Sequence, residues 1–499
     1  MKLLGLWVCA CLLAISPADA QTAELARKSQ QAHELMAAGK VEQALAIYRE
    51  LVQASPNNPG LQLDLGMALH MAGRDLEAIL PLQTAVHAQP DLFPANLFLA
   101  AAYMGIGAPE KAIPPLTKAA ELQPQNPDLQ QELAAALLSL NRFKEAAEHY
   151  QKLTELVPQN PRAWAGLCQC YGALSQEESE KLGRMAKDSG YWFALMAEAR
   201  VESQQFKSAF YLCRQALERT PDLRGVHTEL AEIYRQTGHS DWAATEQEKE
   251  KNLPAPDCTA KKAECDFFTG HYADAIAAAG SHDTPEALYW RTQAYNALAN
   301  NAYAKLQHLP PSVESHELTA MLRRSQWRYR EEVDEWRQAL KLAPNDPEIE
   351  TQLSVALIQI GDHEAARTIL QALEQRYPDS PIINYLLGDT LFKLQKPTQG
   401  IPYLEKAVQR DPHLLAAQSS LARAYVQVGE GPKAIPHLEA ALPIDEDGSL
   451  HYQLARAYTA NGQPQLAQKV LKEYQDIQKA KGAGLQDVEK EVPITAPSD

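Results

Sequence analysis

Two methionines and a histidine stand close together in the stretch GMALHMAGRDLEAILPLQTAVHAQP, which runs from residue 66 to residue 90. Met67, His70 and Met71 have the spacing that places side chains on one face of a helix. Thioether and imidazole groups are soft ligands that can hold Cu(I) where at least three of them converge. Methionine is also flexible and polarizable, which suits a surface that receives the apolar side chains of a peptide. The strip is therefore a candidate for either chemistry.

The first 20 residues have the pattern of a secretory signal. Lys2 precedes an apolar run from Leu3 to Ile15, and small residues follow up to Ala20. This predicts export to the periplasm or the outside, with Gln21 as the first mature residue and no membrane span after cleavage. The alternative is an uncleaved anchor, although the apolar run is short for a span, which needs about 20 residues.

Cysteine supplies the second candidate chemistry, because export permits disulfides. Five cysteines follow the signal, and Cys258 and Cys265, seven residues apart in an irregular stretch, are the favoured pair. The odd number leaves at least one cysteine free. The chain has no CxxC motif, so neither a zinc site nor thioredoxin-like redox chemistry is indicated.

Charge and motifs argue against several classes of function. The formal net charge of −16 opposes general binding to nucleic acid or to anionic lipid. The sequence has no P-loop, dinucleotide fingerprint, HExxH or GxSxG motif, and its histidines are scattered. We therefore predict a non-catalytic protein with no cofactor and no metal, whose partners are proteins.

A repeat of 34 residues organises most of the chain. Gly73, Ala78, Ala85 and Pro90 each recur as the same residue type 34 positions later. A glycine at the end of the first helix allows a positive φ, small residues let two helices approach, and a proline stops the second helix. Each unit holds two stretches of helical periodicity, and units begin near residues 25, 59, 93, 127, 161, 190, 224, 313, 347, 381, 415 and 448.

This period and these recurring residues resemble the tetratricopeptide repeat family over roughly residues 25 to 476. The resemblance implies an all-α fold, an α-solenoid in which helix-turn-helix units stack into a right-handed superhelix. In the family the first helices line a concave groove that commonly holds a peptide or a partner protein. Some positions depart from the pattern: the unit at 161 is shortened, and Glu332 stands where the family has a small residue.

These departures predict the domain organisation. A signal (1–20) precedes an N-terminal superhelix (21–253), an irregular helical joint (254–312) and a C-terminal superhelix (313–480). Residues 481–499 lack apolar periodicity and are expected to be a disordered tail. The acidic run from Gln176 is expected to be the solvated start of a helix.

The family's geometry also predicts which residues face the groove, at positions 2, 5, 9, 12 and 13 of each first helix. In the first three units these are His33, Met36, Leu63, Met67, His70, Met71, Leu97 and Met104. They suit an apolar peptide, and the alternative is that they pack against neighbouring repeats.

In the C-terminal superhelix the same rule selects Tyr385, Asp389, Phe392, Arg423, Tyr452 and Arg456. Arginines flanked by aromatic residues can bind a carboxylate or an acidic segment. The alternative is internal pairing, for example of Arg423 with Asp389.

The leading hypothesis is an exported scaffold for protein–protein or protein–peptide interactions in cell-envelope assembly or secretion. Two other functions stay open: copper handling through the groove methionines and histidines, and an accessory role in an envelope enzyme complex.

Overall fold

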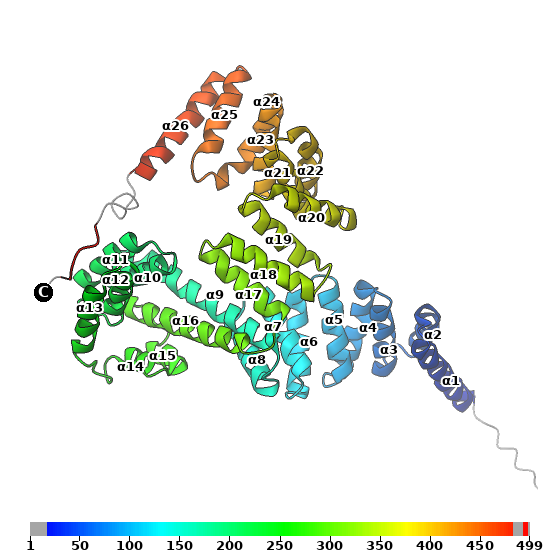
Figure 1. The fold of residues 1–499 in the computed structure, drawn as a ribbon. Helices are drawn as coiled ribbons and strands as arrows, with labels where there is room; N and C mark the ends of the chain where they lie inside the picture. Colours follow the sequence, from blue (N-terminus) through cyan, green and yellow to red (C-terminus); the bar gives the residue numbers. More distant parts are fainter. Residues whose placement is uncertain (1–16, 483–492, 498–499) are drawn as a thin grey trace, which may run out of the picture. The chain divides into compact units, whose positions relative to one another are not determined.

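The computed structural model describes residues 17–482 and 493–497 (Figure 1). In this part of the chain every regular element is a helix. None of the described helices combines the length and the apolar character needed to cross a membrane. The apolar run of the expected signal lies outside the described residues, and α1 begins at Pro17.

The chain forms two compact units, residues 1–174 and 175–499, so the division falls inside α9 (Pro161–Ala186). The expected boundary at 254–312 is a different division and stays a prediction. Before α9, the first unit contains α1 (Pro17–Ala37), α2 (Val41–Ala54), α3 (Pro59–Met71), α4 (Asp75–Ala88), α5 (Phe93–Gly105), α6 (Pro109–Leu122), α7 (Pro127–Ser139) and α8 (Phe143–Leu156).

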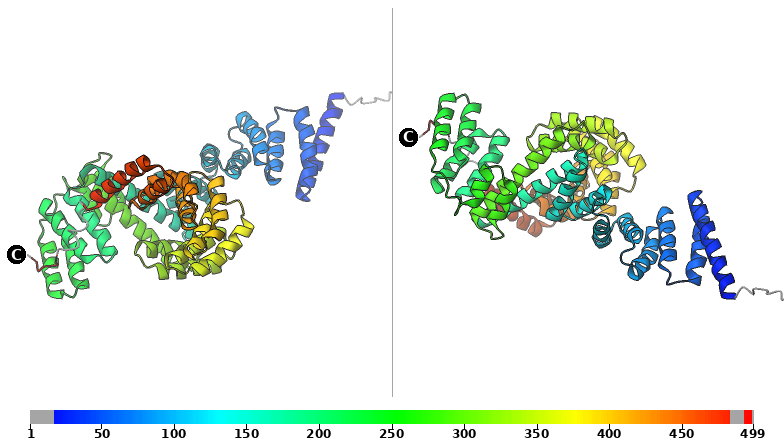
Figure 2. Two further views of the ribbon diagram at one scale, coloured as in Figure 1. Left: turned by 90° about the horizontal axis from the view of Figure 1, so that it is seen from above. Right: turned by 90° about the horizontal axis from the view of Figure 1, so that it is seen from below.

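The second unit continues from α9 as a longer series of helices, which Figures 1 and 2 show mostly as side-by-side pairs. They are α10 (Gly190–Glu202), α11 (Phe206–Arg219), α12 (Val226–Gln236), α13 (Ser240–Asn252), α14 (Lys262–Phe268), α15 (Tyr272–Ala279), α16 (Pro285–Gln307), α17 (Val313–Ser325), α18 (Tyr329–Leu342), α19 (Pro347–Gln359), α20 (His363–Arg376), α21 (Pro381–Lys393), α22 (Pro397–Arg410), α23 (Leu415–Gln427), α24 (Gly431–Ala441), the 3₁₀ turn η1 (Leu442–Ile444), α25 (Ser449–Ala460) and α26 (Pro464–Gly482).

The predicted stacked helix-turn-helix architecture is confirmed. First helices begin at the expected residue in most units, and in all of these except α23 a proline in the first two helical positions or a capping side chain before them favours the start. The side chain of Asn58 accepts hydrogen bonds at the start of α3, and that of Asp346 does so at the start of α19. The helices that begin at the expected residue are α3, α5, α7, α9, α10, α17, α19, α21 and α23.

Small residues bring the paired helices into close contact, as their recurrence predicted. A Cβ atom added to Gly400 on α22 would lie 2.7 Å from the carbonyl oxygen of Gly388 on α21. A Cβ on Gly66 would meet the side chain of Leu82 at 2.4 Å. At Gly400 the two backbones are therefore too close for a side chain, whereas a side chain at Gly66 would require Leu82 to move.

The turn between paired helices requires a positive φ, which glycine adopts without strain, as at Gly73 (φ 71°). Trp327 occupies the corresponding turn between α17 and α18 with φ 61° and a side chain that is 65% exposed. We expect Trp327→Gly to raise the free energy of unfolding by about 1 kcal/mol, because an L-residue pays about that much in the left-handed region. Urea denaturation followed by circular dichroism measures this.

The matched control for Trp327 is Trp327→Ala, which removes the indole but keeps the Cβ atom and so should gain no stability. The indole ring lies edge-on to Tyr329 with centroids 6.1 Å apart. A loss of stability in Trp327→Gly would mean that this ring contact outweighs the backbone strain.

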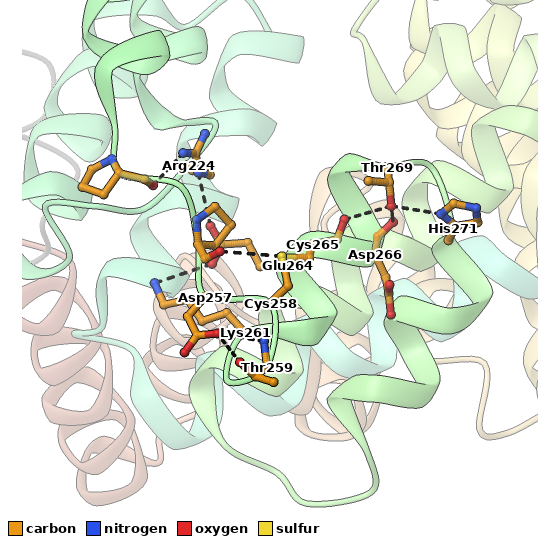
Figure 3. The surroundings of a disulfide bond; sticks show 12 residues. Arg224, Asp257, Cys258, Thr259, Lys261, Glu264, Cys265, Asp266, Thr269 and His271 are labelled. Atoms are coloured by element: carbon orange, nitrogen blue, oxygen red, sulfur yellow. Dashed lines mark hydrogen bonds and ion pairs between the residues drawn. A yellow bond between two sulfur atoms is a disulfide. The ribbon is translucent and has the colours of Figure 1, made fainter.

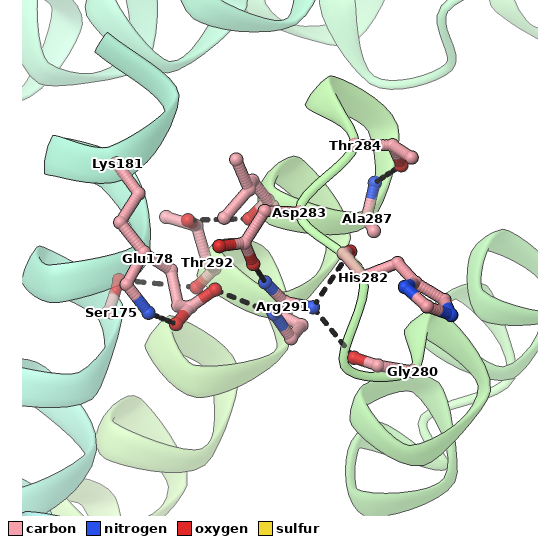
Figure 4. A network of polar contacts seen from close by, with 11 residues as sticks. Ser175, Glu178, Lys181, Gly280, His282, Asp283, Thr284, Ala287, Arg291 and Thr292 are labelled. Atoms are coloured by element: carbon pink, nitrogen blue, oxygen red, sulfur yellow. Dashed lines mark hydrogen bonds and ion pairs between the residues drawn. The ribbon is translucent and has the colours of Figure 1, made fainter. Parts of the chain in front are cut away.

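The shortened unit at 161 forms one continuous helix, α9, because no glycine turn interrupts it. The expectation that Gln176 opens a solvated helix is wrong, since this residue lies inside α9. Glu178, from the same run, is 8% exposed and receives a hydrogen bond of 2.6 Å from Nε of Arg291 (Figure 4). Arg291, 7% exposed, also donates to Asp283 (2.7 Å) and to the carbonyl oxygen of Gly280 (2.6 Å). This cluster, buried except at Asp283, joins α9 to α16 and to the loop before it.

The stretch 254–312 holds the short hairpin of α14 and α15 and the long helix α16. The structure contains the disulfide between Cys258 and Cys265, the pair favoured by the sequence, and it joins the segment before the hairpin to α14 (Figure 3). Arg224 donates hydrogen bonds to the carbonyl oxygens of Leu253 (3.0 Å) and Pro254 (2.7 Å). These contacts hold the chain where it leaves α13.

The expected disordered tail is described only in part. Residues 481 and 482 belong to α26, and residues 483–492 and 498–499 lie outside the described residues. Residues 493–497 differ from the expectation, because they lie against the second unit: the hydroxyl of Tyr234 on α12 donates a hydrogen bond of 2.7 Å to the carbonyl oxygen of Thr495.

Candidate functional site

The residues predicted to line the N-terminal groove all lie on the first helices α1, α3 and α5 of the first unit. None of the eight is buried. Met71 is 57% exposed and Met104 is 38% exposed, whereas Met36, Leu63, Met67 and Leu97 are half-buried. The strip therefore presents apolar surface to solvent and also packs in part against its neighbours. That it binds a partner stays a prediction.

Both histidines of the strip contact carboxylates. Nε2 of His33 lies 3.1 Å from Oδ2 of Asp64, and Nδ1 of His70 lies 2.5 Å from Oδ1 of Asp75. Across the described residues, no three histidine, cysteine, aspartate or glutamate side chains gather closely enough to hold a metal ion. A copper site here would therefore depend on the thioethers.

In the C-terminal repeats, the alternative pairing of Arg423 with Asp389 does not form. Asp389 is 6% exposed, accepts a hydrogen bond from Ser420 (2.8 Å) and forms an ion pair with Lys393 (3.0 Å). The Arg423 guanidinium instead stacks over the ring of Phe392 at 5.0 Å. Asp389 is thus a buried residue that connects α21 to α23 through Ser420.

Arg423 and Arg456 line two separate hollows. Arg423 shares a hollow of about 510 Å³ with Asp445, Glu446 and Asp447, whose carboxylates oppose an acidic ligand. Arg456 lies in a hollow of about 500 Å³ between α25 and α26, beside Tyr452 and with no other charged residue in its lining. Of the two arginines, Arg456 is therefore the better placed to bind a carboxylate.

The structure adds a cavity of about 210 Å³ between α10, α12, α14 and α16, which the sequence did not predict. Its walls combine the rings of Phe267, Phe268, Tyr289 and Trp290 with the carboxyl groups of Glu198 and Glu229. Gln293 on α16 donates a hydrogen bond of 2.8 Å to Glu198. Aromatic faces and carboxyl groups together suit a group that carries positive charge or donates hydrogen bonds.

Burial in this cavity alters the titration of its acids. Burial raises the pKa of Glu229 to about 7, and the nearby Glu198 and Glu202 add to this. Burial also raises the pKa of Glu198, against the hydrogen bond from Gln293. Glu229 therefore changes charge near neutral pH.

We expect this titration to make the protein less stable as pH rises. The folded state holds the Glu229 proton up to a higher pH than the unfolded chain does, so stability falls between about pH 4.5 and pH 7. The full loss corresponds to about 3 kcal/mol. Glu229→Gln should remove this loss of stability. Urea unfolding of both proteins at pH 5 and pH 7.5 measures the difference.

Glu232 on the same helix supplies the control for this pH effect. Hydrogen bonds from Gln236 and Arg235 lower its pKa, so Glu232→Gln should leave the fall in stability in place. If the free energy of unfolding of Glu229→Gln fell with pH as much as that of the wild type, the pH dependence would come from other groups.

Part of this cavity lies at the groove positions of the units that begin at 190 and 224. These positions hold Ala194, Glu198 and Thr228, which line the cavity. The aromatic wall comes from α14 and α16, which follow no repeat register, so no sequence pattern placed it opposite those positions.

Comparisons with known proteins point to one family. A family model described as "Tetratricopeptide repeat" matches residues 104–170, 336–389 and 391–451, and a second model with the same description matches residues 29–93. Tetratricopeptide repeat protein 21A of Mus musculus is 31% identical over 93 residues. The match covers 19% of this chain and only 7% of that protein.

Several solved structures are each similar to about a third of this chain. MamA from Desulfovibrio magneticus RS-1 is 20% identical with a TM-score of 0.31, and the match covers 34% of this chain and 97% of that one. The thermophilic TPR protein TTC0263 of Thermus thermophilus is 19% identical with a TM-score of 0.29, covering 35% and 100%. YrrB, described as a TPR protein with an unusual peptide-binding site, is 18% identical with a TM-score of 0.29, covering 35% and 91%.

Proposed function

Because the chain is a tetratricopeptide repeat protein, we propose that it is a non-catalytic scaffold that binds a protein or peptide along its first helices. The observation that carries this proposal is the exposure of Met71 (57%) and Met104 (38%) at groove positions of successive first helices. Apolar side chains left open to solvent at neighbouring groove positions (13 and 12) of adjacent repeats fit a segment that lies across them. The flexible thioethers would adapt to the apolar side chains of that segment.

The proposed scaffold works outside the cytoplasm, in envelope assembly or secretion. Two features support this location. The first 20 residues have the pattern of a secretory signal, and the disulfide between Cys258 and Cys265 is of a kind that persists in oxidising compartments. Fractionation of cells that express the tagged chain tests the location, and a cytoplasmic product with both cysteines reduced would contradict it.

Affinity capture from an envelope extract of the source cells tests the binding surface. The wild-type chain is compared with a Met67→Glu, Met71→Glu double variant, in which two carboxylates replace the thioethers of the strip. We expect the wild type to retain a partner that the double variant loses, because a charge in an apolar contact must be desolvated. Circular dichroism verifies that the variant keeps its helices.

The matched control is the double variant Leu76→Glu, Leu80→Glu on α4, the second helix of the same repeat. These side chains are 75% and 70% exposed, so the control adds the same charge outside the first helices. It should retain the partner. A partner that all three chains retain would exclude the methionine strip and direct the search to Tyr452 and Arg456.

A further inference from the structure

The segment 493–497, with the sequence Pro-Ile-Thr-Ala-Pro, makes specific contacts with the second unit although it forms neither helix nor strand. The Tyr234 hydroxyl donates a hydrogen bond of 2.7 Å to the carbonyl oxygen of Thr495. Ile494 is half-buried and packs against the apolar core of α10 to α13. Pro497 lines a hollow of about 470 Å³ with residues from α11, α12 and α13.

The donor of this hydrogen bond is held rigidly in the repeat. Tyr234 is 2% exposed, and its ring lies between those of Phe210 (5.9 Å between centroids) and Trp242 (5.5 Å). Burial raises the pKa of Tyr234 to about 12, so the hydroxyl keeps its proton at physiological pH. The site therefore presents a fixed donor to an extended backbone.

The chemistry of the segment fits such a site. Prolines at both ends restrict its backbone before it binds, so ordering it costs little conformational entropy. Its accepting group is a backbone carbonyl, and its buried side chain is one isoleucine. A short, extended, proline-flanked peptide with a central apolar residue has these properties.

The hollow that Pro497 lines on α11, α12 and α13 lies on a different face of α12 from the acidic cavity. Leu230 and Tyr234 line the hollow around Pro497, whereas Thr228 and Glu229 line the cavity. At 100° per residue these two pairs point in roughly opposite directions. The other walls of the hollow come from the second helices α11 and α13, so the segment does not occupy the face formed by the first helices.

We propose that α11, α12 and α13 form a binding site for short proline-flanked peptides, and that residues 493–497 of the same chain fill it as an internal ligand. Ten residues connect Gly482 at the end of α26 to Pro493. Because the segment belongs to the same chain, its binding to the site is intramolecular and does not depend on protein concentration. A free peptide of the same kind must therefore compete with the segment for the site.

The test uses the full chain and a fluorescent peptide with the sequence of residues 490–499, KEVPITAPSD. Ile494→Glu releases the segment by placing a charge in its apolar contact. We expect fluorescence anisotropy to show the peptide binding this variant at least tenfold more tightly than the wild type, because the internal competitor is gone. Ile382→Glu, the same change at a 44% exposed isoleucine on α21, should behave as the wild type.

A second variant tests whether the peptide binds at Tyr234. Adding Tyr234→Phe to Ile494→Glu removes only the donated hydroxyl and should weaken peptide binding about threefold to tenfold, the effect of one hydrogen bond. Peptide affinity that does not change would place the peptide elsewhere and overturn the proposal. Equal peptide binding by wild type, Ile494→Glu and Ile382→Glu, or binding by none of them, would overturn it as well.

Sedimentation identifies the source of the bound segment. Concentration-dependent dimers of the wild type that Ile494→Glu abolishes would assign the segment to a second copy and so contradict an internal ligand. This result is independent of partner capture by Met67 and Met71, which belong to the first unit. The scaffold function can therefore fail while the internal ligand stands, or the reverse.

Discussion

Replacing Arg291 by methionine should destabilise the second unit by about 1.5–3 kcal/mol, because the buried Glu178 loses a charged hydrogen-bond donor and keeps only Lys181, 2.7 Å away. Asp283, 44% exposed, can be solvated after the change. Arg291 bonds Glu178 through Nε at 2.6 Å and Asp283 through Nη2 at 2.7 Å. A third bond, to the carbonyl oxygen of Gly280, completes the fork. Urea unfolding of the full chain, followed by circular dichroism, measures the loss in the transition that includes α9 and α16.

Two further variants make this prediction specific. Arg291→Lys keeps the charge but not the fork and should lose less than Arg291→Met. Arg142→Met removes an exposed arginine that pairs with Glu145 within one helix turn, and such pairs contribute only about 0–1 kcal/mol. Equal losses in Arg291→Met and Arg142→Met would show that the buried cluster adds nothing beyond a surface pair.

Replacing Arg324 by methionine should cost about 3–5 kcal/mol, because Glu332 would remain fully buried without a cation. Glu332 is 0% exposed and accepts hydrogen bonds from Nε of Arg324 (2.6 Å) and from the Trp336 indole (3.3 Å). The same urea measurement applies, to the transition that includes α17 and α18.

The reverse change tests the asymmetry of this pair. Glu332→Ala places a small residue where the repeat pattern has one, and the Arg324 side chain, 38% exposed, can reach solvent. It should therefore cost at least about 2 kcal/mol less than Arg324→Met. If Glu332→Ala proved the more damaging of the two, the carboxylate would be stabilising the fold rather than depending on its partner.

The regular part of the fold could be predicted from the sequence because its determinants are local. A proline such as Pro59 or Pro347 marks the start of a helix, and a glycine such as Gly73 marks its end, whatever the surroundings. The spacing of Cys258 and Cys265 likewise made their pairing predictable. At these positions, single residues with narrow conformational or chemical roles determine the structure.

The irregular parts depend on contacts between distant residues. In the sequence, Glu178 is one acid in a polar run and is expected to be exposed. Its burial depends on an ion pair with Arg291, which lies 113 residues later in the chain. Trp290 and Phe268 belong to helices that do not follow the 34-residue repeat. The sequence therefore indicates that they are core residues, but it does not predict that they lie opposite Glu198. The candidate groove residues were placed correctly on first helices, whereas the cavity that α14 and α16 enclose required the structure.

The contact between Tyr234 and Thr495 spans 261 residues, yet each repeat of a solenoid rests mainly on its neighbours. In such an array, small rotations at successive interfaces add up, so the two ends would drift widely with thermal bending. Ten residues lie between α26 and the bound segment, and at about 3.5 Å per residue they can span at most about 35 Å. While the bond is formed, it therefore sets an upper limit on how far the end of α26 can move from α12, although it does not fix the rotation between them.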